Sequence, residues 1–341
     1  MNELRKLEKP VTRAAPAGAV LLFIQKISGG ILMANNLQKK PFLDYHAQIK
    51  YLKQKQLVIN NEAYATTVLE KVSYYGLING YKAIFKDPAT NNFYPGTSFD
   101  DIYNLYLFDA ELRDVFLKYI LIFEKHVKSS ISYHFSNTYG NGIAFYQDIN
   151  NYDYGNHLSD VQYLFRKMNG KIYGHHPSPQ VAHYMNTYQD VPLWVLTTDL
   201  TIGETASMYR YLKGHCKTLV CNDIYHIGRN ELGKMLVILT KYRNICAHGN
   251  RLFNARTQDS IPDLIAHKKL HIPKVNSRYQ QGKSDLFATV ISLKYLLDTT
   301  DFRLFHYQLK NVIKQYNPSN KTLKLMGFPP NWMSILRITV Y

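Results

Sequence analysis

The chain has 341 residues, of which 46% are hydrophobic and 19% charged, a composition typical of folded proteins that excludes wholesale disorder. A formal net charge of +16 favours a polyanionic partner such as nucleic acid, although the abundance of Tyr, Asn, Lys and Ile also suits an A/T-rich genome. No stretch approaches the ~20 apolar residues that span a bilayer, so we expect no membrane-spanning helix and no membrane partner. Three cysteines cannot form a disulfide framework, and we expect reduced thiols and a cytoplasmic protein.

Residues 1–36 differ in pattern from the rest of the chain. Basic residues precede a short apolar run at 17–24, as in a signal peptide, but no small-residue cleavage site follows. We expect a flexible N-terminal extension that carries no function.

From residue 40 onward the periodicity is mainly helical, with apolar residues at three- and four-residue steps. We expect helices in the ranges 40–81, 99–139, 192–212, 230–248, 284–298 and 301–316. The longest follows a cap-like Thr97-Ser98-Phe99-Asp100 and would reach about 60 Å, so we expect a kink or break inside it. Turns are expected at 87–96 and polar loops over 140–192. Strand-like alternation is nearly absent, which predicts a mainly α fold.

Histidines at 157, 175, 176 and 183 lie in the polar region and could suggest a metal site. No Cys or carboxylate accompanies them at ligand spacing, so we interpret them as loop residues and expect no metal or other cofactor.

The residues with the clearest chemistry lie near the end of the 230–248 helix, where Gly249 is a natural helix stop. At about 100° per residue, Asn244 and His248 lie about 40° apart on one face, whereas Arg243 and His248 lie about 140° apart. Arg243 and His248 therefore converge only if the helix ends near His248 or if the arginine side chain wraps round.

An imidazole beside a guanidinium suits metal-free RNA cleavage. His248 could take the proton of a ribose 2′-hydroxyl or protonate the leaving oxygen, and Arg243 could hold the scissile phosphate. Neighbouring polar residues could follow the RNA backbone, and those we expect to do so are Lys241, Asn250, Arg251, Asn254 and Arg256. The alternative is a solvated helix end with cations near its C-terminus, and His248 as a cap or a buried structural histidine.

A second Arg-x4-His pair, Arg210 and His215, lacks the polar residue after the arginine and the downstream amide set. We interpret it as a helix surface that runs into a turn.

The segment Arg243-Asn244-Ile-Cys-Ala-His248-Gly-Asn-Arg251-Leu-Phe-Asn254 resembles the signature of Abi-like (AbiD/AbiF-type) abortive-infection proteins, which carry a HEPN domain. Further blocks resemble the family over roughly residues 37–335, and they begin at Lys40, Tyr74, Phe108, Ile122, Pro192 and Met326. The chain has Gly249 and Phe253 where the family often has a bulkier polar residue and Trp.

The resemblance implies a HEPN ribonuclease of phage defence, with RNA as substrate and a small regulatory RNA or antitoxin as partner. It implies Arg243 and His248 as the catalytic pair, with Asn244 orienting the site. Since HEPN sites combine two motif copies and this chain has one, it also implies a homodimer. Some HEPN families have a Glu-x-x-x-Lys pair on the preceding helix. Glu124 and Lys128 match that spacing, which equally suits a plain intrahelical ion pair.

On this basis we expect a HEPN-like helical bundle with helical additions at both ends. The expected parts are an extension at 1–36, a helical segment at 37–98, a HEPN-like core at 99–256 and a helical segment at 257–341. Two other functions remain open: a non-cleaving RNA-binding module that holds a small regulatory RNA or senses a phage product, and an enzyme that modifies nucleotides. No glycine-rich phosphate loop supports the latter.

Overall fold

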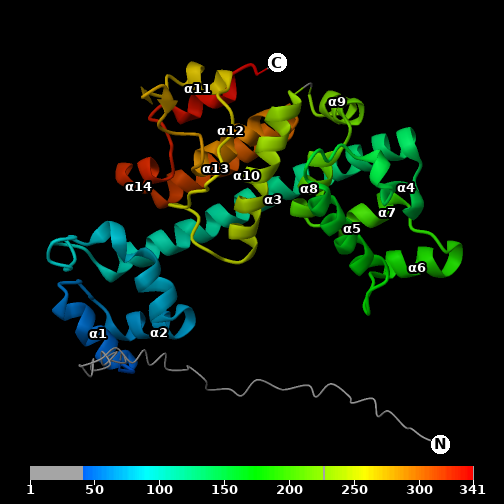
Figure 1. Cartoon of the computed structure of the whole chain (residues 1–341). Helices are drawn as coiled ribbons and strands as arrows, with labels where there is room; N and C mark the ends of the chain where they lie inside the picture. The colour runs from blue at the N-terminus through cyan, green and yellow to red at the C-terminus, as the bar shows by residue number, and fades with distance from the viewer. Residues whose placement is uncertain (1–40, 226, 341) are drawn as a thin grey trace, which may run out of the picture. The chain divides into compact units, whose positions relative to one another are not determined.

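The computed structural model describes residues 41–225 and 227–340, which are mainly helical as expected (Figure 1). Residues Asp44–Tyr341 form one compact unit by their contacts, and the other unit, Met1–Leu43, lies almost wholly outside the described residues. The expected extension at 1–36 therefore falls outside them, and the subdivision of the remaining chain stays a prediction. Every helix among the described residues is too short or too polar to cross a bilayer.

Short helices precede the longest one. They are α1 (Tyr45–Gln54), α2 (Glu62–Val72), the π-helical segment η1 (Tyr75–Asn79) and the 3-10 segment η2 (Lys82–Phe85). The Asn61 side chain caps α2 by accepting the N–H of Tyr64 at 2.9 Å.

The central helix α3 (Phe99–Tyr139) has 41 residues and no interruption, so the expected break is wrong. Its first turn is fixed by a capping box in which Ser98 and Asp101 bond each other's backbone N–H. It packs against α7 (Leu193–Asp199), α9 (Gly214–Asp223), α10 (Arg229–Ala247) and α13 (Thr299–Tyr316). Because buried residues recur from Phe99 to Phe135, tertiary contacts support the helix over most of its length.

The polar region after α3 contains helices that the sequence pattern did not predict. They are α4 (Ile143–Tyr146), the 3-10 turn η3 (Ile149–Asn151), α5 (Leu158–Ile172) and α6 (Pro179–Tyr188). The expectation of loops is therefore wrong for α5 and α6. In α5, four apolar residues are buried at helical spacing, but polar residues and Gly170 between them hide the pattern: Val161, Leu164, Met168 and Ile172.

The expected 192–212 helix is divided into α7 and α8 (Ile202–Tyr211), because Leu200 has an extended backbone (ψ 137°). Thr201 then starts α8 with a capping box to Glu204.

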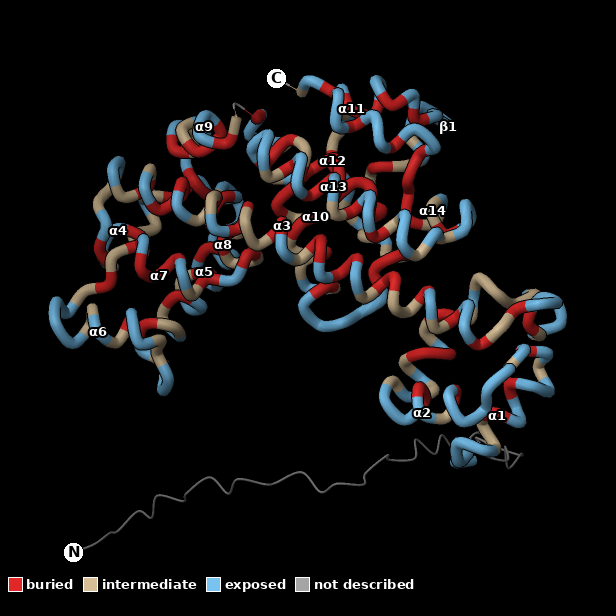
Figure 2. Tube along the Cα trace, turned by 180° about the vertical axis from the view of Figure 1, so that it is seen from behind, coloured by how far each residue is buried: buried red, intermediate tan, exposed pale blue. Residues whose placement is uncertain are grey.

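The C-terminal part covers α10 and α3. It consists of α11 (Ile265–Lys269), the antiparallel pair β1 (Lys274–Val275) and β2 (Arg278–Tyr279), α12 (Leu286–Leu296), α13, α14 (Asn320–Leu325) and the 3-10 segment η4 (Trp332–Arg337). Helix α12 is buried on nearly every side and packs against α10 and α3. Buried residues accordingly recur along α3, α10 and α12 in Figure 2.

Candidate active site

The candidate site is built at the C-terminal end of α10. The helix ends at Ala247, His248 is its C-cap residue, and Gly249 has a φ of +66° that leaves the helix. The predicted stop at Gly249 is thus confirmed. Buried apolar residues hold the inner face of the helix against α3 and α12, as the periodicity predicts: Leu232, Met235, Leu236, Leu239 and Tyr242.

Arg243 reaches from α10 toward the middle of α3. Its Nε lies 3.9 Å from Oε2 of Glu124, whose Oε1 is 2.7 Å from Nζ of Lys128. The Glu124 side chain is only 7% exposed, so this carboxylate is a nearly buried bridge between two cations. The structure therefore brings Glu124 and Lys128 to Arg243, a contact that the i, i+4 spacing alone left undecided.

The distal nitrogens of Arg243 carry few contacts. Nη1 makes a long contact of 3.5 Å with Oδ1 of Asn244, and the side chain is 29% exposed. Neither Nε of Arg243 nor Oε2 of Glu124 has a hydrogen-bond partner among the described residues. The guanidinium is thus oriented by charge while its outer edge stays available to an anion.

Asn244 and His248 lie one turn apart, and both are exposed. The backbone N–H of His248 donates to the carbonyl of Asn244 at 3.0 Å, which continues the helical ladder to the cap. The His248 imidazole makes no hydrogen bond within the described part of the chain and is free to meet a ligand. The structure contradicts a buried structural histidine here.

The loop after His248 is clamped to α3 by a buried carboxylate. Asp109 accepts the backbone N–H groups of Leu252 and Phe253, the latter at 2.6 Å. It also accepts the Tyr81 hydroxyl at 2.8 Å and Nη1 of Arg113 at 2.7 Å. Burial raises the pKa of Asp109, and these four donors oppose that shift. Sequence reasoning did not place Asp109, Arg113 or Tyr81 at the site, although each lies in a block that resembles the family.

The Phe253 ring is buried and stacks on Tyr81 with ring centroids 5.8 Å apart. Cys246, the second-last residue of α10, is also buried, which raises the pKa of its thiol to about 12. This cysteine is therefore a packing residue and no nucleophile at neutral pH.

Three cations expected to bind RNA already have protein partners. Lys241 forms an ion pair with Asp259, Arg251 donates to the carbonyl of Gly80, and Nη1 of Arg256 lies 2.8 Å from the buried Asp285. Burial also lowers the pKa of Arg256. Asn250 is exposed and Asn254 is half-buried, so both remain near the helix end without such a partner. The structure thus favours a structural role for Lys241 and Arg256, in which each binds a carboxylate from a later segment of the chain.

A cavity of about 520 Å³ adjoins the Glu124–Lys128 pair, and α3 and α7 form its walls. Trp194 lines it with a side chain that is 47% exposed, beside the hydroxyl-bearing residues Thr197 and Thr198. Sequence reasoning missed Trp194 as a site residue. The exposed indole of Trp194, beside the Glu124–Lys128 ion pair, offers a face on which an aromatic ring could stack.

No group of three or more His, Cys, Asp or Glu side chains within residues 41–225 and 227–340 is arranged to hold a metal ion. Neither a search of curated proteins nor a search of solved structures gives a significant match. The model of the Abi-like protein family, by contrast, matches residues 67–254. This span is more than half of the chain and includes α3, α10 and the clamped loop. The chain therefore belongs to the family of Abi-like proteins.

Proposed function

We propose that this protein acts in abortive infection as a HEPN-type endoribonuclease that cleaves RNA without a metal ion. The observation that carries the proposal is the arrangement at the end of α10. There a half-buried guanidinium oriented by Glu124 accompanies an exposed imidazole on a rigidly clamped helix end. A guanidinium stabilises the charge of a phosphorane-like transition state, and an imidazole transfers protons near neutral pH.

The proposed reaction is a transesterification. One His248 takes the proton of a ribose 2′-hydroxyl, and the 2′-oxygen forms a bond to phosphorus as the P–O5′ bond breaks. A second imidazole donates a proton to the departing 5′-oxygen. The products are a 2′,3′-cyclic phosphate and a 5′-hydroxyl end, and no external water or oxidant is consumed in this step.

The second imidazole comes from a second copy of the chain. One chain carries one His248 at the end of α10, and Arg243 lies on a face about 140° away. A two-fold pairing of helix ends would place two His248 and two Arg243 side chains around one phosphate. We therefore propose a homodimer with a composite site.

The Trp194 cavity supplies the binding energy next to the cleaved bond. A base flanking the scissile phosphate stacks on the indole, while Lys128 and the threonine hydroxyls offer polar contacts. This places base recognition on α7 and phosphate chemistry on α10.

The test is RNA integrity in cells after brief induction, with and without phage challenge, with 3′ ends mapped. Wild type should produce fragments with cyclic phosphate ends, whereas His248→Ala and Arg243→Ala should not. His46→Ala, an exposed histidine on α1, is the matched control and should cleave like wild type. Cleavage that survives in both site variants would refute the proposal. RNA that is bound but stays intact with every variant would favour the non-cleaving binding module.

A further inference from the structure

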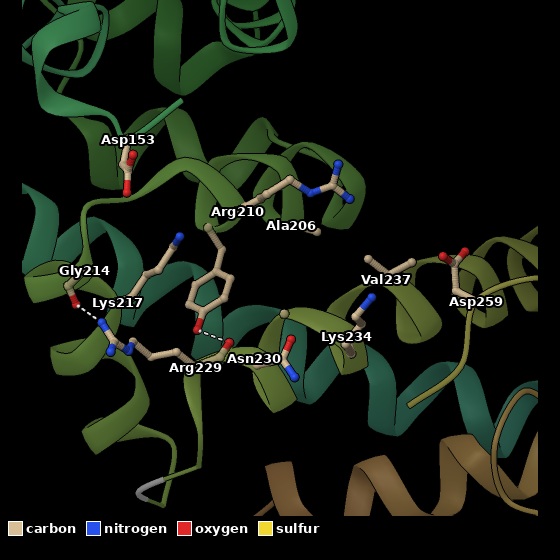
Figure 3. A pocket seen from close by; sticks show the side chains of 12 residues that line it. Asp153, Ala206, Arg210, Gly214, Lys217, Arg229, Asn230, Lys234, Val237 and Asp259 are labelled. Atoms are coloured by element: carbon tan, nitrogen blue, oxygen red, sulfur yellow. Dashed lines mark hydrogen bonds between the residues drawn. The ribbon is translucent and has the colours of Figure 1, made fainter. Parts of the chain in front are cut away.

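A second pocket lies at the opposite end of α10 from His248. It has a volume of about 480 Å³ and is formed by α8, α9 and the first half of α10 (Figure 3). Four cations line it against two carboxylates, namely Arg210, Lys217, Arg229 and Lys234 against Asp153 and Asp259. We call this the basic pocket.

The cations of the basic pocket are incompletely neutralised. Lys217 is half-buried, and no described carboxylate forms an ion pair with it. Burial lowers the pKa of Lys217, an effect that nearby Asp153 opposes and Arg229 reinforces. Lys234 is exposed and likewise forms no ion pair within the described residues. Asp259 is engaged by Lys241, so it is a weak counter-charge for the pocket.

Arg229 is held in place by a neutral group. Its Nη1 donates to the carbonyl of Gly214 at 3.4 Å, and a Cβ at position 214 would lie 3.0 Å from that nitrogen (Figure 3). The glycine thus lets the guanidinium lie close to the start of α9, where no carboxylate among the described residues forms an ion pair with it. Such a fixed cation beside a half-buried lysine is suited to a phosphate group.

Part of the lining of the basic pocket is apolar. Ala206 and Val237 line it together with the ring of Tyr209, whose hydroxyl donates to the carbonyl of Arg229 at 3.0 Å. A cavity of this size, lined by both cationic and apolar side chains, accommodates a phosphate together with its attached sugar.

The pocket and His248 lie on one face of α10. Steps of four, three, four, three and four residues connect the positions on this face: Asn230, Lys234, Val237, Lys241, Asn244 and His248. Each is exposed or half-buried, whereas the inner face is buried. From Lys234 to His248 the axis extends about 21 Å at 1.5 Å per residue. An extended single strand of a few nucleotides covers that distance.

We propose that the basic pocket holds a backbone phosphate of the RNA strand, a few nucleotides from the scissile bond, and that the strand follows the outer face of α10 to His248. This inference rests on the proposed function for the identity of the strand. It adds an anchoring site that is remote from the chemistry.

The test measures binding without cleavage. Full-length His248→Ala protein is titrated into a fluorescein-labelled 12-nucleotide single-stranded RNA, and anisotropy is read at several salt concentrations. Adding Lys217→Gln and Lys234→Gln should weaken binding at least tenfold and reduce the salt slope by about 1 to 2, because phosphate contacts release counterions. The matched control adds Lys310→Gln and Lys314→Gln on α13, which removes the same charge from exposed positions. That control should lose less than threefold.

Equal losses in the two double variants would overturn the inference, since only net charge would then matter. Displacement of the RNA by micromolar adenosine monophosphate, but not by adenosine, would also overturn it in favour of a free-nucleotide site. Thermal midpoints of both variants are compared with the parent, and if the Lys217 change unfolds the protein, Lys234→Gln alone is titrated. Failure of the proposed function would instead appear as absent cleavage by wild type with pocket-dependent binding intact.

Discussion

The carboxylate of Asp109 accepts the backbone N–H of Phe253 at 2.6 Å, a bond between residues 144 positions apart in the chain. Through this bond, the first third of α3 determines the path of the loop that follows the exposed His248. The site therefore depends on a buried carboxylate that does not itself touch the proposed substrate.

Replacing Asp109 should destabilise the fold and the loop together. Asp109→Asn removes the charge that pairs with Arg113 in a buried setting, and breaking such a pair costs about 3 to 5 kcal/mol. Urea denaturation measures the free energy of unfolding. Asp114→Asn, at an exposed position on the same helix, is the control and should change it by less than about 0.5 kcal/mol. A loss below about 1 kcal/mol for Asp109→Asn would contradict the clamp.

The bridge from Glu124 to Arg243 should matter for turnover more than for binding. Glu124→Gln keeps the shape of the side chain but removes the charge that orients the guanidinium. We expect kcat to fall by about 10- to 100-fold with a small change in KM, because small errors in position have large rate costs. Steady-state cleavage kinetics test this, with Glu111→Gln at an exposed position on α3 as control. An unchanged kcat would assign Glu124 a purely structural role.

Trp194 should contribute to RNA affinity through stacking. Trp194→Ala removes a surface worth about 1 to 3 kcal/mol per stacked base, so the Kd should rise by about 5- to 150-fold. Because the indole is 47% exposed, the thermal midpoint should barely change. Tyr307→Ala, an exposed aromatic position on α13, is the control.

The same binding can be followed by fluorescence. The other tryptophan, Trp332, is only 6% exposed, so quenching on addition of RNA should report on Trp194. Quenching that persists undiminished in Trp194→Ala would refute stacking on this ring.

Stability should fall as the pH drops below the ordinary histidine pKa of about 6.5. His267 is buried, Leu264 N–H donates to its Nδ1 at 3.1 Å, and Nε2 donates to the carbonyl of Gly282 at 2.8 Å. Burial lowers the pKa of His267, which favours the neutral ring that this pattern of bonds describes. Below pH 6.5 the unfolded chain therefore binds more protons than the folded one, which favours unfolding.

Urea denaturation at pH 5, 6, 7 and 8 measures this effect. His267→Gln should be less stable at pH 8 but should show a flatter decline between pH 7 and 5. Burial also lowers the pKa of His306. The free energy of unfolding of His267→Gln should therefore still fall somewhat as the pH drops. An unchanged decline in His267→Gln would assign the acid sensitivity to other groups.

Local sequence determined the elements whose signals lie within a few residues. The apolar period of α10, its stop at Gly249 and the cap at Ser98 are all encoded by neighbours in the chain. The relative positions of Arg243, Asn244 and His248 follow from the same helical period. Helices α5 and α6 could not be predicted in this way, because α5 depends on α8 to bury a sparse apolar stripe.

The tertiary structure decided which charged side chains form ion pairs and which do not. Lys241 and Lys234 lie on one face of one helix, yet only Lys241 meets a carboxylate, because the later segment that carries Asp259 passes beside it. Likewise, the sequence pattern pairs Glu124 only with Lys128 on the same helix. The packing of α10 on α3 adds Arg243 as a second cation beside the Glu124 carboxylate. A helical period is a local property of the backbone, whereas the pairing of charges depends on which faces meet in space. For that reason the sequence determined the candidate Arg and His, and only the fold decided what orients them.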